Sequence, residues 1–256
     1  MSVVRNLHQR AYKLLPACIL LPFAVIAHQA NANVIIHATR VIYPQDQREV
    51  NIQLTNDAER PSLIQSWIDD GDDKSSFNNT SVPFVLTPPI IRVEPNSGQT
   101  LRLTWTGGAS LPQDKESIFW LNILDIPPKN TDTPDANMLQ MAIRSRLKVF
   151  FRPPALSAEG AKKAFYDLQW KYSPSAPKTV LVVNNPSPYF VNISNVKIER
   201  NKKEIKSLKG EMIAPGSAAE FRFTALPDNI KNDEIRYEAI NDHGSVITIK
   251  TTQKTR

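Results

Sequence analysis

Apolar and polar residues alternate with a period of two in several short segments of this chain. Val50–Leu54 and Thr100–Trp105 show the alternation, and Val180–Val183 is a short run that is apolar throughout. Clusters of Pro, Asn, Asp and Gly separate the segments, and the chain holds 20 prolines but only 8 glycines. Short strands separated by frequent turns are typical of antiparallel β-sandwiches, so the pattern predicts an all-β protein.

One alternating segment, Leu139–Arg152, is longer than the others. Six of its seven odd-numbered positions are apolar and four of its seven even-numbered positions are basic, which helical periodicity would not produce. A strand of about 14 residues exceeds the usual five or six. The pattern alone favours two shorter strands or one ordinary strand before a linker. The alternative is that part of the strand packs in the core of its own domain while Leu139, Met141 and Ile143 face a partner.

Pro153-Pro154 is the predicted domain boundary, because proline stiffens the chain and cannot continue a central strand. The first domain then spans residues 33–152, with the long strand at about 137–152, and the second spans 153–256. Ser157–Lys163 is polar and is predicted to be a surface loop. Further strands are predicted at Tyr166–Trp170, Thr179–Asn184, Tyr189–Val196, Ala218–Phe223 and Ser245–Thr251.

The N-terminal residues 1–32 have the order of a secretory signal peptide: basic, then apolar, then small. The apolar stretch Leu14–Ala27 is shorter than the roughly 20 residues of a membrane-spanning helix. Ala30-Asn31-Ala32 provides small residues for cleavage after Ala32, with cleavage after Ala27 as the alternative. The basic residues are Arg5, Arg10 and Lys13. We therefore expect an exported protein that starts at Asn33, with no membrane insertion of the mature chain.

Composition excludes most catalytic chemistry. The single cysteine, Cys18, lies in the signal segment, and its faint likeness to a lipoprotein acylation site is the weaker interpretation. His37 and His243 are the only histidines after residue 32, and HExxH, GxSxG and phosphate-binding loop motifs are absent. We expect no metal and no cofactor. The acidic segment Asp69–Asp73 lacks the downstream glutamate of a calcium loop, so a solvated turn is favoured.

The net charge of +6 is modest, and three of these charges belong to the signal segment. Charges of both signs are interspersed along the rest of the chain. This distribution favours an ordinary soluble surface over nucleic-acid binding.

An ordered set of motifs resembles the periplasmic chaperones of chaperone–usher pilus systems over essentially the whole mature chain. Each motif is weak alone, and the resemblance depends on their order. In chain order the motifs are Ala38-Thr39-Arg40, Gln65–Ile68, Thr87-Pro88-Pro89, Leu111–Ser117, Phe119–Ile123, Ile126-Pro127-Pro128, Leu147–Pro153, Asn185–Phe190 and Ile240–Gly244.

The resemblance implies two immunoglobulin-like β-sandwich domains with a cleft between them. It also implies a non-catalytic chaperone that lends its long strand to an incomplete pilus subunit and delivers the subunit to an outer-membrane usher. Leu139, Met141 and Ile143 would be the strand's anchors, and Arg40 and Lys148 would bind the subunit's C-terminal carboxylate. Glu116, Arg152 and Asp242 would form a structural interdomain salt bridge.

Two features depart from the family pattern. Residues 129–136 form a slightly longer loop than in the most familiar short-loop members, and the mature chain lacks the cysteine pair that many relatives have in the second domain. The alternative function is an immunoglobulin-like binding or adhesion protein of the cell envelope, which would use loops instead of a strand. A periplasmic hydrolase is a distant third.

Overall fold

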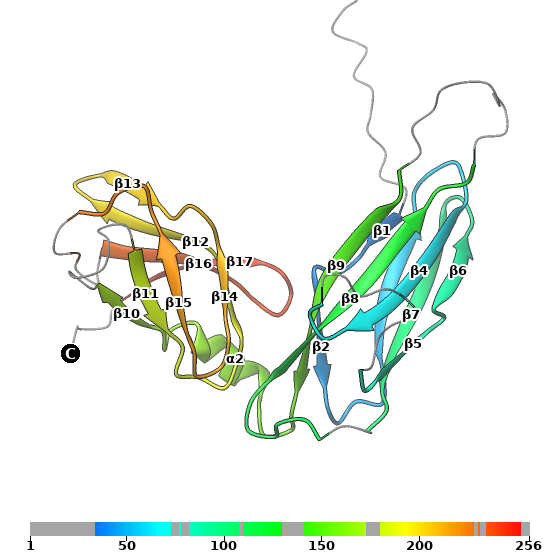
Figure 1. The fold of residues 1–256 in the computed structure, drawn as a ribbon, viewed down its shortest axis with the longest axis horizontal. Helices are drawn as coiled ribbons and strands as arrows, with labels where there is room; N and C mark the ends of the chain where they lie inside the picture. The colour runs from blue at the N-terminus through cyan, green and yellow to red at the C-terminus, as the bar shows by residue number, and fades with distance from the viewer. Residues whose placement is uncertain are drawn as a thin grey trace, which may run out of the picture. The chain divides into compact units, whose positions relative to one another are not determined.

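In the computed structural model, the described residues are 34–72, 77, 82–107, 110–129, 141–172, 180–227, 230 and 234–251. The predicted signal peptide, residues 1–32, lies outside them. The regular structure of the described chain is β-strand apart from one short helix (Figure 1). The described residues form two separate hydrophobic cores, one built from residues before Arg152 and one from residues after it. The predicted all-β class with two β-sandwiches is confirmed.

The first sandwich consists of two sheets. One has the strand order β1-β3-β7-β5 and the other has the order β2-β9-β8-β4-β6. The strands are β1 (Val34–Ile36), β2 (Arg40–Pro44), β3 (Val50–Asn56), β4 (Ser62–Asp69), β5 (Phe84–Thr87), β6 (Ile90–Val93), β7 (Ser97–Trp105), β8 (Ser117–Ile126) and β9 (Ile143–Arg152).

Alternation of side chains builds the core of this sandwich. Ile52 and Leu54 of β3 are buried from one sheet, and Leu121 of β8 and Val149 of β9 are buried from the other. Because successive strand residues point to opposite faces, the intervening polar residues face outward. The predicted strands Val50–Leu54 and Thr100–Trp105 therefore lie within observed strands with the expected face buried.

The second sandwich follows the same design. One sheet has the order β10-β11-β15, and the other has the order β13-β12-β16-β17 with β14 also paired to β12. Its core includes Leu181, Val196, Phe221 and Tyr237, which are at most 1% exposed. The strands are β10 (Gln169–Tyr172), β11 (Val180–Asn184), β12 (Val191–Arg200), β13 (Lys203–Lys206), β14 (Glu211–Ile213), β15 (Ala218–Arg222), β16 (Ile235–Ile240) and β17 (Val246–Lys250).

The segment predicted as a surface loop at Ser157–Lys163 is a helix instead, α2 (Ala158–Ala164). The Ser157 side chain caps it by accepting a hydrogen bond from the Gly160 backbone N–H at 3.0 Å. Ala161 and Ala164 are buried on one face. Two alanines three residues apart form an apolar stripe too narrow to stand out among the polar residues around it, which is why the prediction was wrong.

The predicted long strand is also shorter than expected. Strand β9 begins at Ile143, while Met141 and Ala142 are not in a strand, and residues 137–140 lie outside the described part of the chain. The register explains the start, because Ile143 pairs with Asp125 one residue before β8 ends at Ile126. Pro127 and Pro128 follow and have no N–H to donate, so β8 cannot continue the ladder.

Candidate functional site

Strand β9 has two neighbours along only half of its length. It pairs antiparallel with β8 from Ile143 to Phe151, whereas β2 pairs with it in parallel only from Lys148 to Arg152. In the described residues, the backbone of Ile143–Leu147 therefore has a hydrogen-bonded strand on one side only. Among the described residues, the strand before β2 does not cover this edge, because β1 (Val34–Ile36) pairs with β3 in the opposite sheet. Figure 1 shows β2 alongside only part of β9.

The odd-numbered side chains of β9 change from buried to exposed along this edge. Leu147 is 5% exposed and Val149 is fully buried, but Ile143 is 58% exposed, and Met141, two residues before the strand, is 64% exposed. The pattern alone did not favour this difference; the exposure of Met141 and Ile143 agrees with the alternative interpretation, and their role as anchors stays a prediction. Leu139, the third predicted anchor, lies outside the described residues. The open edge thus carries the exposed apolar side chain of Ile143 on the face that continues the core, and exposed Met141 lies just before the strand begins.

Arg40 and Lys148 are adjacent across the β2–β9 ladder, where the open edge ends. Arg40 Nη1 donates to the Ile240 carbonyl at 3.1 Å, and Lys148 Nζ donates to Asn192 Oδ1. The Nε atom of Arg40 is buried without a hydrogen-bond partner. Among the described residues, neither cation forms an ion pair, so this basic pair has unused capacity to bind an anion.

Burial and the neighbouring charges shift the pKa values of both members of the basic pair. Burial lowers the pKa of the Arg40 guanidinium, and the charge of Asp242 partly offsets this effect. Burial also lowers the pKa of the Lys148 ammonium, and the neighbouring charge of Arg40 lowers it further. Two like charges held together and partly desolvated are stabilised by a bound carboxylate.

The predicted group of Glu116, Arg152 and Asp242 is brought together at the C-terminal end of β9. Arg152 Nε donates to Glu116 Oε1 at 2.8 Å, and Arg152 Nη1 donates to Asp242 Oδ2 at 2.8 Å. The side chains of Arg152 and Glu116 are 7% and 2% exposed, while that of Asp242 is 27% exposed. Arg152 therefore joins a carboxylate of the first sandwich to one of the second.

Further contacts surround this ion group. The other Glu116 oxygen accepts the Phe190 backbone N–H at 2.8 Å, and the Phe190 ring lies 5.7 Å from that of Phe150. Burial raises the pKa of the Glu116 carboxyl, opposed by the charge of Arg152. Burial acts to lower the pKa of Arg152, but its hydrogen bonds to Asp242 and the charge of Glu116 raise it overall.

Three of these partners were not identified from the sequence: Asn192, Phe190 and the Ile240 carbonyl. Asn192 and Phe190 belong to a segment whose alternation predicts a strand, and nothing in that pattern distinguishes a residue that contacts the other sandwich. A main-chain carbonyl has no sequence signal at all.

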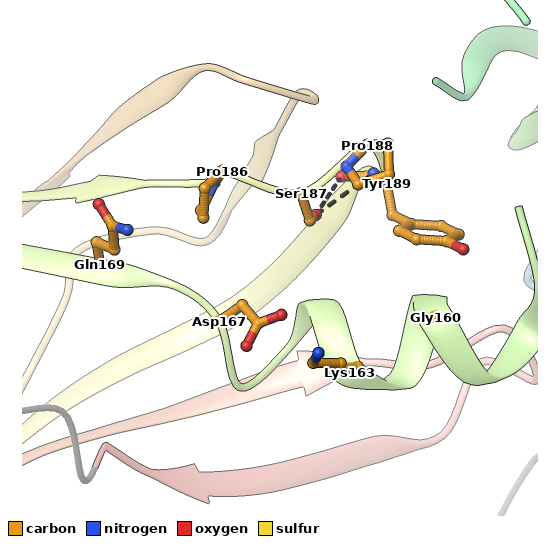
Figure 2. A pocket seen from close by; sticks show the side chains of 8 residues that line it. All are labelled: Gly160, Lys163, Asp167, Gln169, Pro186, Ser187, Pro188 and Tyr189. Atoms are coloured by element: carbon orange, nitrogen blue, oxygen red, sulfur yellow. Dashed lines mark hydrogen bonds between the residues drawn. The ribbon is translucent and has the colours of Figure 1, made fainter. Parts of the chain in front are cut away.

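Two cavities flank helix α2 in the second sandwich. One has a volume of about 500 Å³. Figure 2 shows its lining, in which Lys163 and Asp167 lie opposite the Ser187–Tyr189 turn. The other has a volume of about 410 Å³ and lies beside Phe165, Asp242 and His243. Within the described part of the chain, no three His, Cys, Asp or Glu side chains gather as a metal site would require. Nor do the described helices include one long and apolar enough to cross a membrane.

Comparison with known proteins agrees with this architecture. Residues 33–157 match the family described as "Pili and flagellar-assembly chaperone, PapD N-terminal domain", and residues 163–251 match "Pili assembly chaperone PapD, C-terminal domain". The probable fimbrial chaperone YadV of Escherichia coli K12 is 40% identical over 218 residues, which cover 84% of this chain and 88% of YadV.

Solved structures give the same result. The CupB2 chaperone of Pseudomonas aeruginosa is 38% identical with a TM-score of 0.71, covering 85% of this chain and 98% of that one. A Salmonella enterica structure of the SafA pilin in complex with the SafB chaperone matches at 26% identity and a TM-score of 0.68, covering 87% and 98% of the two chains.

Two β-sandwiches, with a basic pair at the end of an open strand edge, define the structural class of this chain. The matches make the class specific: the chain belongs to the PapD family of pilus-assembly chaperones. It is a fimbrial chaperone and not an enzyme, as the sequence predicted.

Proposed function

We propose that this chaperone acts in the periplasm by lending the open edge of β9 to an incomplete fimbrial subunit. The observation that carries the proposal is the stretch Ile143–Leu147, which has one hydrogen-bonded neighbour and is flanked by exposed Met141. An unpaired strand edge is a template for another strand. The SafA–SafB complex supports a pilin as the type of client.

Apolar burial drives the binding. Met141 and Ile143 are more than half exposed in the free protein, and each would contribute about 1.5–3 kcal/mol on full burial. Leu139 is the third proposed anchor. Part of this gain is offset by the loss of freedom when the client strand is ordered. Main-chain hydrogen bonds to Ile143–Leu147 add directionality, because they form only with an extended segment.

The basic pair fixes the end of the client strand. Arg40 and Lys148 would bind the subunit's C-terminal carboxylate through charge-assisted hydrogen bonds, which are stronger than neutral ones. The buried Arg40 Nε that has no partner supports this role, because an unsatisfied buried donor is costly until an acceptor arrives. Arg152, with Glu116 and Asp242, has a structural role in which it joins the two sandwiches.

Export and delivery complete the proposal. Residues 1–32 are the signal peptide that sends the chain to the periplasm, and the mature protein starts at Asn33. The two domains are residues 33–152 and 153–256, with the cleft between them. The loaded chaperone then passes its subunit to an outer-membrane usher.

The decisive experiment replaces the exposed anchors with a charge. Met141→Glu and Ile143→Glu should change the free energy of unfolding by no more than about 0.5 kcal/mol, as ordinary surface substitutions do. Both should abolish co-purification of the fimbrial subunit, because the carboxylate would be buried in the client without a partner. Val246→Glu is the matched control, since Val246 is a strand residue of the second sandwich that is 56% exposed.

Leu147→Glu separates the two parts of the strand. Its side chain is in the core, so the substitution should unfold the first sandwich. If Met141→Glu and Ile143→Glu leave subunit capture at the level of Val246→Glu, the strand-lending function is wrong. The adhesin alternative would then be tested by substitutions in the loops.

A further inference from the structure

The open half of β9 carries a second set of side chains on the face opposite the core. Arg144 and Arg146 are on this outer face, together with Asn122 and Trp120 of β8 and Trp67 of β4. A strand edge with one neighbour is held by half the usual hydrogen bonds and frays readily. Side chains on this outer face are the contacts that could keep Ile143–Leu147 extended when no client is present.

A continuous chain of polar contacts links β9 to β8 and β4. Arg144 donates from Nε and Nη2 to Asn122 Oδ1, at 2.9 and 2.7 Å. Asn122 Nδ2 donates to Asp69 Oδ2 at 2.6 Å. Arg146 Nη2 donates to Asp69 Oδ1 at 2.7 Å. Both arginines of the open half are thus attached to side chains of neighbouring strands.

Aromatic rings lie beneath the same two guanidinium groups. The guanidinium carbon of Arg144 lies 5.1 Å from the centre of the Trp67 ring, and that of Arg146 lies 4.5 Å from the centre of the Trp120 ring. These distances are within the range of cation–π attraction. The stacking also limits where each arginine side chain can go, which favours one extended backbone conformation.

Asp69 is the centre of this network. Its side chain is 2% exposed, and Oδ1 also accepts the Gly71 backbone N–H at 2.8 Å. Gly71 has φ of 117°, a backbone conformation that other residues rarely adopt. The solvated turn predicted for Asp69–Asp73 is therefore wrong for Asp69, whose carboxylate lies inside the sheet face. From the sequence, Asp69–Asp73 was interpreted as one polar segment, so the burial of Asp69 was not predicted.

We propose that Asp69, Asn122, Trp67 and Trp120 are positioning residues that hold Arg144 and Arg146, and through them hold the open half of β9 ready for a client. The inference rests on the proposed function of β9. A binding segment that is ordered only part of the time loses apparent affinity in proportion to that fraction. The network keeps the fraction near one, so its loss weakens capture without removing any atom that touches the client's strand.

The test compares Asp69→Asn with a matched control in the same full-length mature chaperone. The control is Glu234→Gln, because Glu234 is likewise a partly buried carboxylate paired with an arginine: it accepts two hydrogen bonds from Arg200 and is 16% exposed. Amide hydrogen exchange is measured on the free protein. In Asp69→Asn the β9 amides at residues 143–147 that bond to β8 should exchange about tenfold faster, the effect expected from losing a charge-assisted bond.

Three outcomes decide the matter. Faster exchange confined to residues 143–147, with Val149–Phe151 and the control unchanged, supports the inference, as does subunit binding about tenfold weaker. Unchanged exchange at residues 143–147 overturns it. If Asp69→Asn speeds exchange throughout the first sandwich, Arg144→Met decides instead, because Arg144 is 31% exposed and its loss should affect only the open half.

The exchange result is independent of the client. Wild-type protein that fails to bind any fimbrial subunit would refute the proposed function while leaving the exchange pattern intact. Subunit capture that is lost in Met141→Glu but normal in Asp69→Asn would refute the positioning role alone.

Discussion

Replacing Arg152 with methionine tests the buried ion group most directly. Met keeps an unbranched apolar stem and removes only the guanidinium, so the loss of packing is small. The substitution leaves Glu116 with a side chain that is 2% exposed and without its ionic partner. Asp242 is also released, but it is 27% exposed and can be solvated.

The expected loss in free energy of unfolding follows from the different exposure of Glu116 and Asp242. Removing one partner of a buried ion pair costs about 3–5 kcal/mol, because the remaining charge is uncompensated. Glu116 keeps one hydrogen bond, from the Phe190 N–H, which places the expected loss near the lower end, at about 3 kcal/mol. Asp242→Asn should cost about 1 kcal/mol or less, since it disturbs a contact that is partly open to water.

The loss of stability in Arg152→Met should depend on pH. Burial already raises the pKa of Glu116 above its ordinary value, so the folded protein takes up a proton at a higher pH than the unfolded chain does. Stability then rises as pH falls through the folded-state pKa towards the ordinary value. Without the charge of Arg152 this pKa rises further, so the deficit of Arg152→Met should shrink on acidification from neutral pH.

Urea unfolding followed by tryptophan fluorescence provides the assay. Trp67, Trp105 and Trp120 belong to the first sandwich and only Trp170 to the second, so the signal reports mainly on the domain that contains Glu116. The double variant Glu116→Gln/Arg152→Met removes the stranded charge and should recover most of the loss. Equal stability of Arg152→Met and Asp242→Asn at pH 7 would refute the reasoning.

Three further predictions concern other parts of the molecule. Burial and the charge of Arg40 lower the pKa of Lys148, so subunit affinity should fall with rising pH at a lower pH than that at which free lysine titrates. Lys148→Arg should remove this pH dependence. Titration calorimetry of subunit binding across alkaline pH would measure both. Gly210→Ala should destabilise the second sandwich by about 1–3 kcal/mol, since the added Cβ would lie 2.5 Å from the Ile193 carbonyl oxygen; an unchanged unfolding midpoint would contradict this. Protein from the periplasm should begin at Asn33, and N-terminal sequencing that finds residues 1–32 intact would refute the proposed cleavage.

Much of the fold could be predicted because alternation and burial share one physical cause. A strand in a two-layer sandwich has one face in the core, so Val50–Leu54 and the home-packed end of β9 reveal their structure by period alone. The ion group of Arg152 came only from the resemblance, because Glu116 and Asp242 are 126 residues apart and no periodic signal links them.

The missed features depend on tertiary contacts. Helix α2 needs only two small buried alanines, Ala161 and Ala164, so its apolar stripe is too weak to recognise in a polar segment. Strand β9 starts at Ile143 because its partner β8 stops, and strand pairing is not encoded in the segment itself. Asp69 is buried because arginines from a distant strand neutralise it, which no local pattern of acids predicts.

The pairing of β1 with β3 instead of β9 sets the length of the open edge of β9. If the chain before Arg40 continued alongside β9, it would cover the positions around Ile143; instead it crosses to the other sheet within residues 37–39. From Lys148 to Met141 there are seven positions, or about 23 Å of extended chain at about 3.3 Å per residue. If the proposed binding of the client's C-terminus at the basic pair is correct, that end fixes which client residue lies opposite each residue of the open edge. Adding one residue to the client's C-terminus would turn every side chain to the opposite face, and adding two would restore the phase one step along.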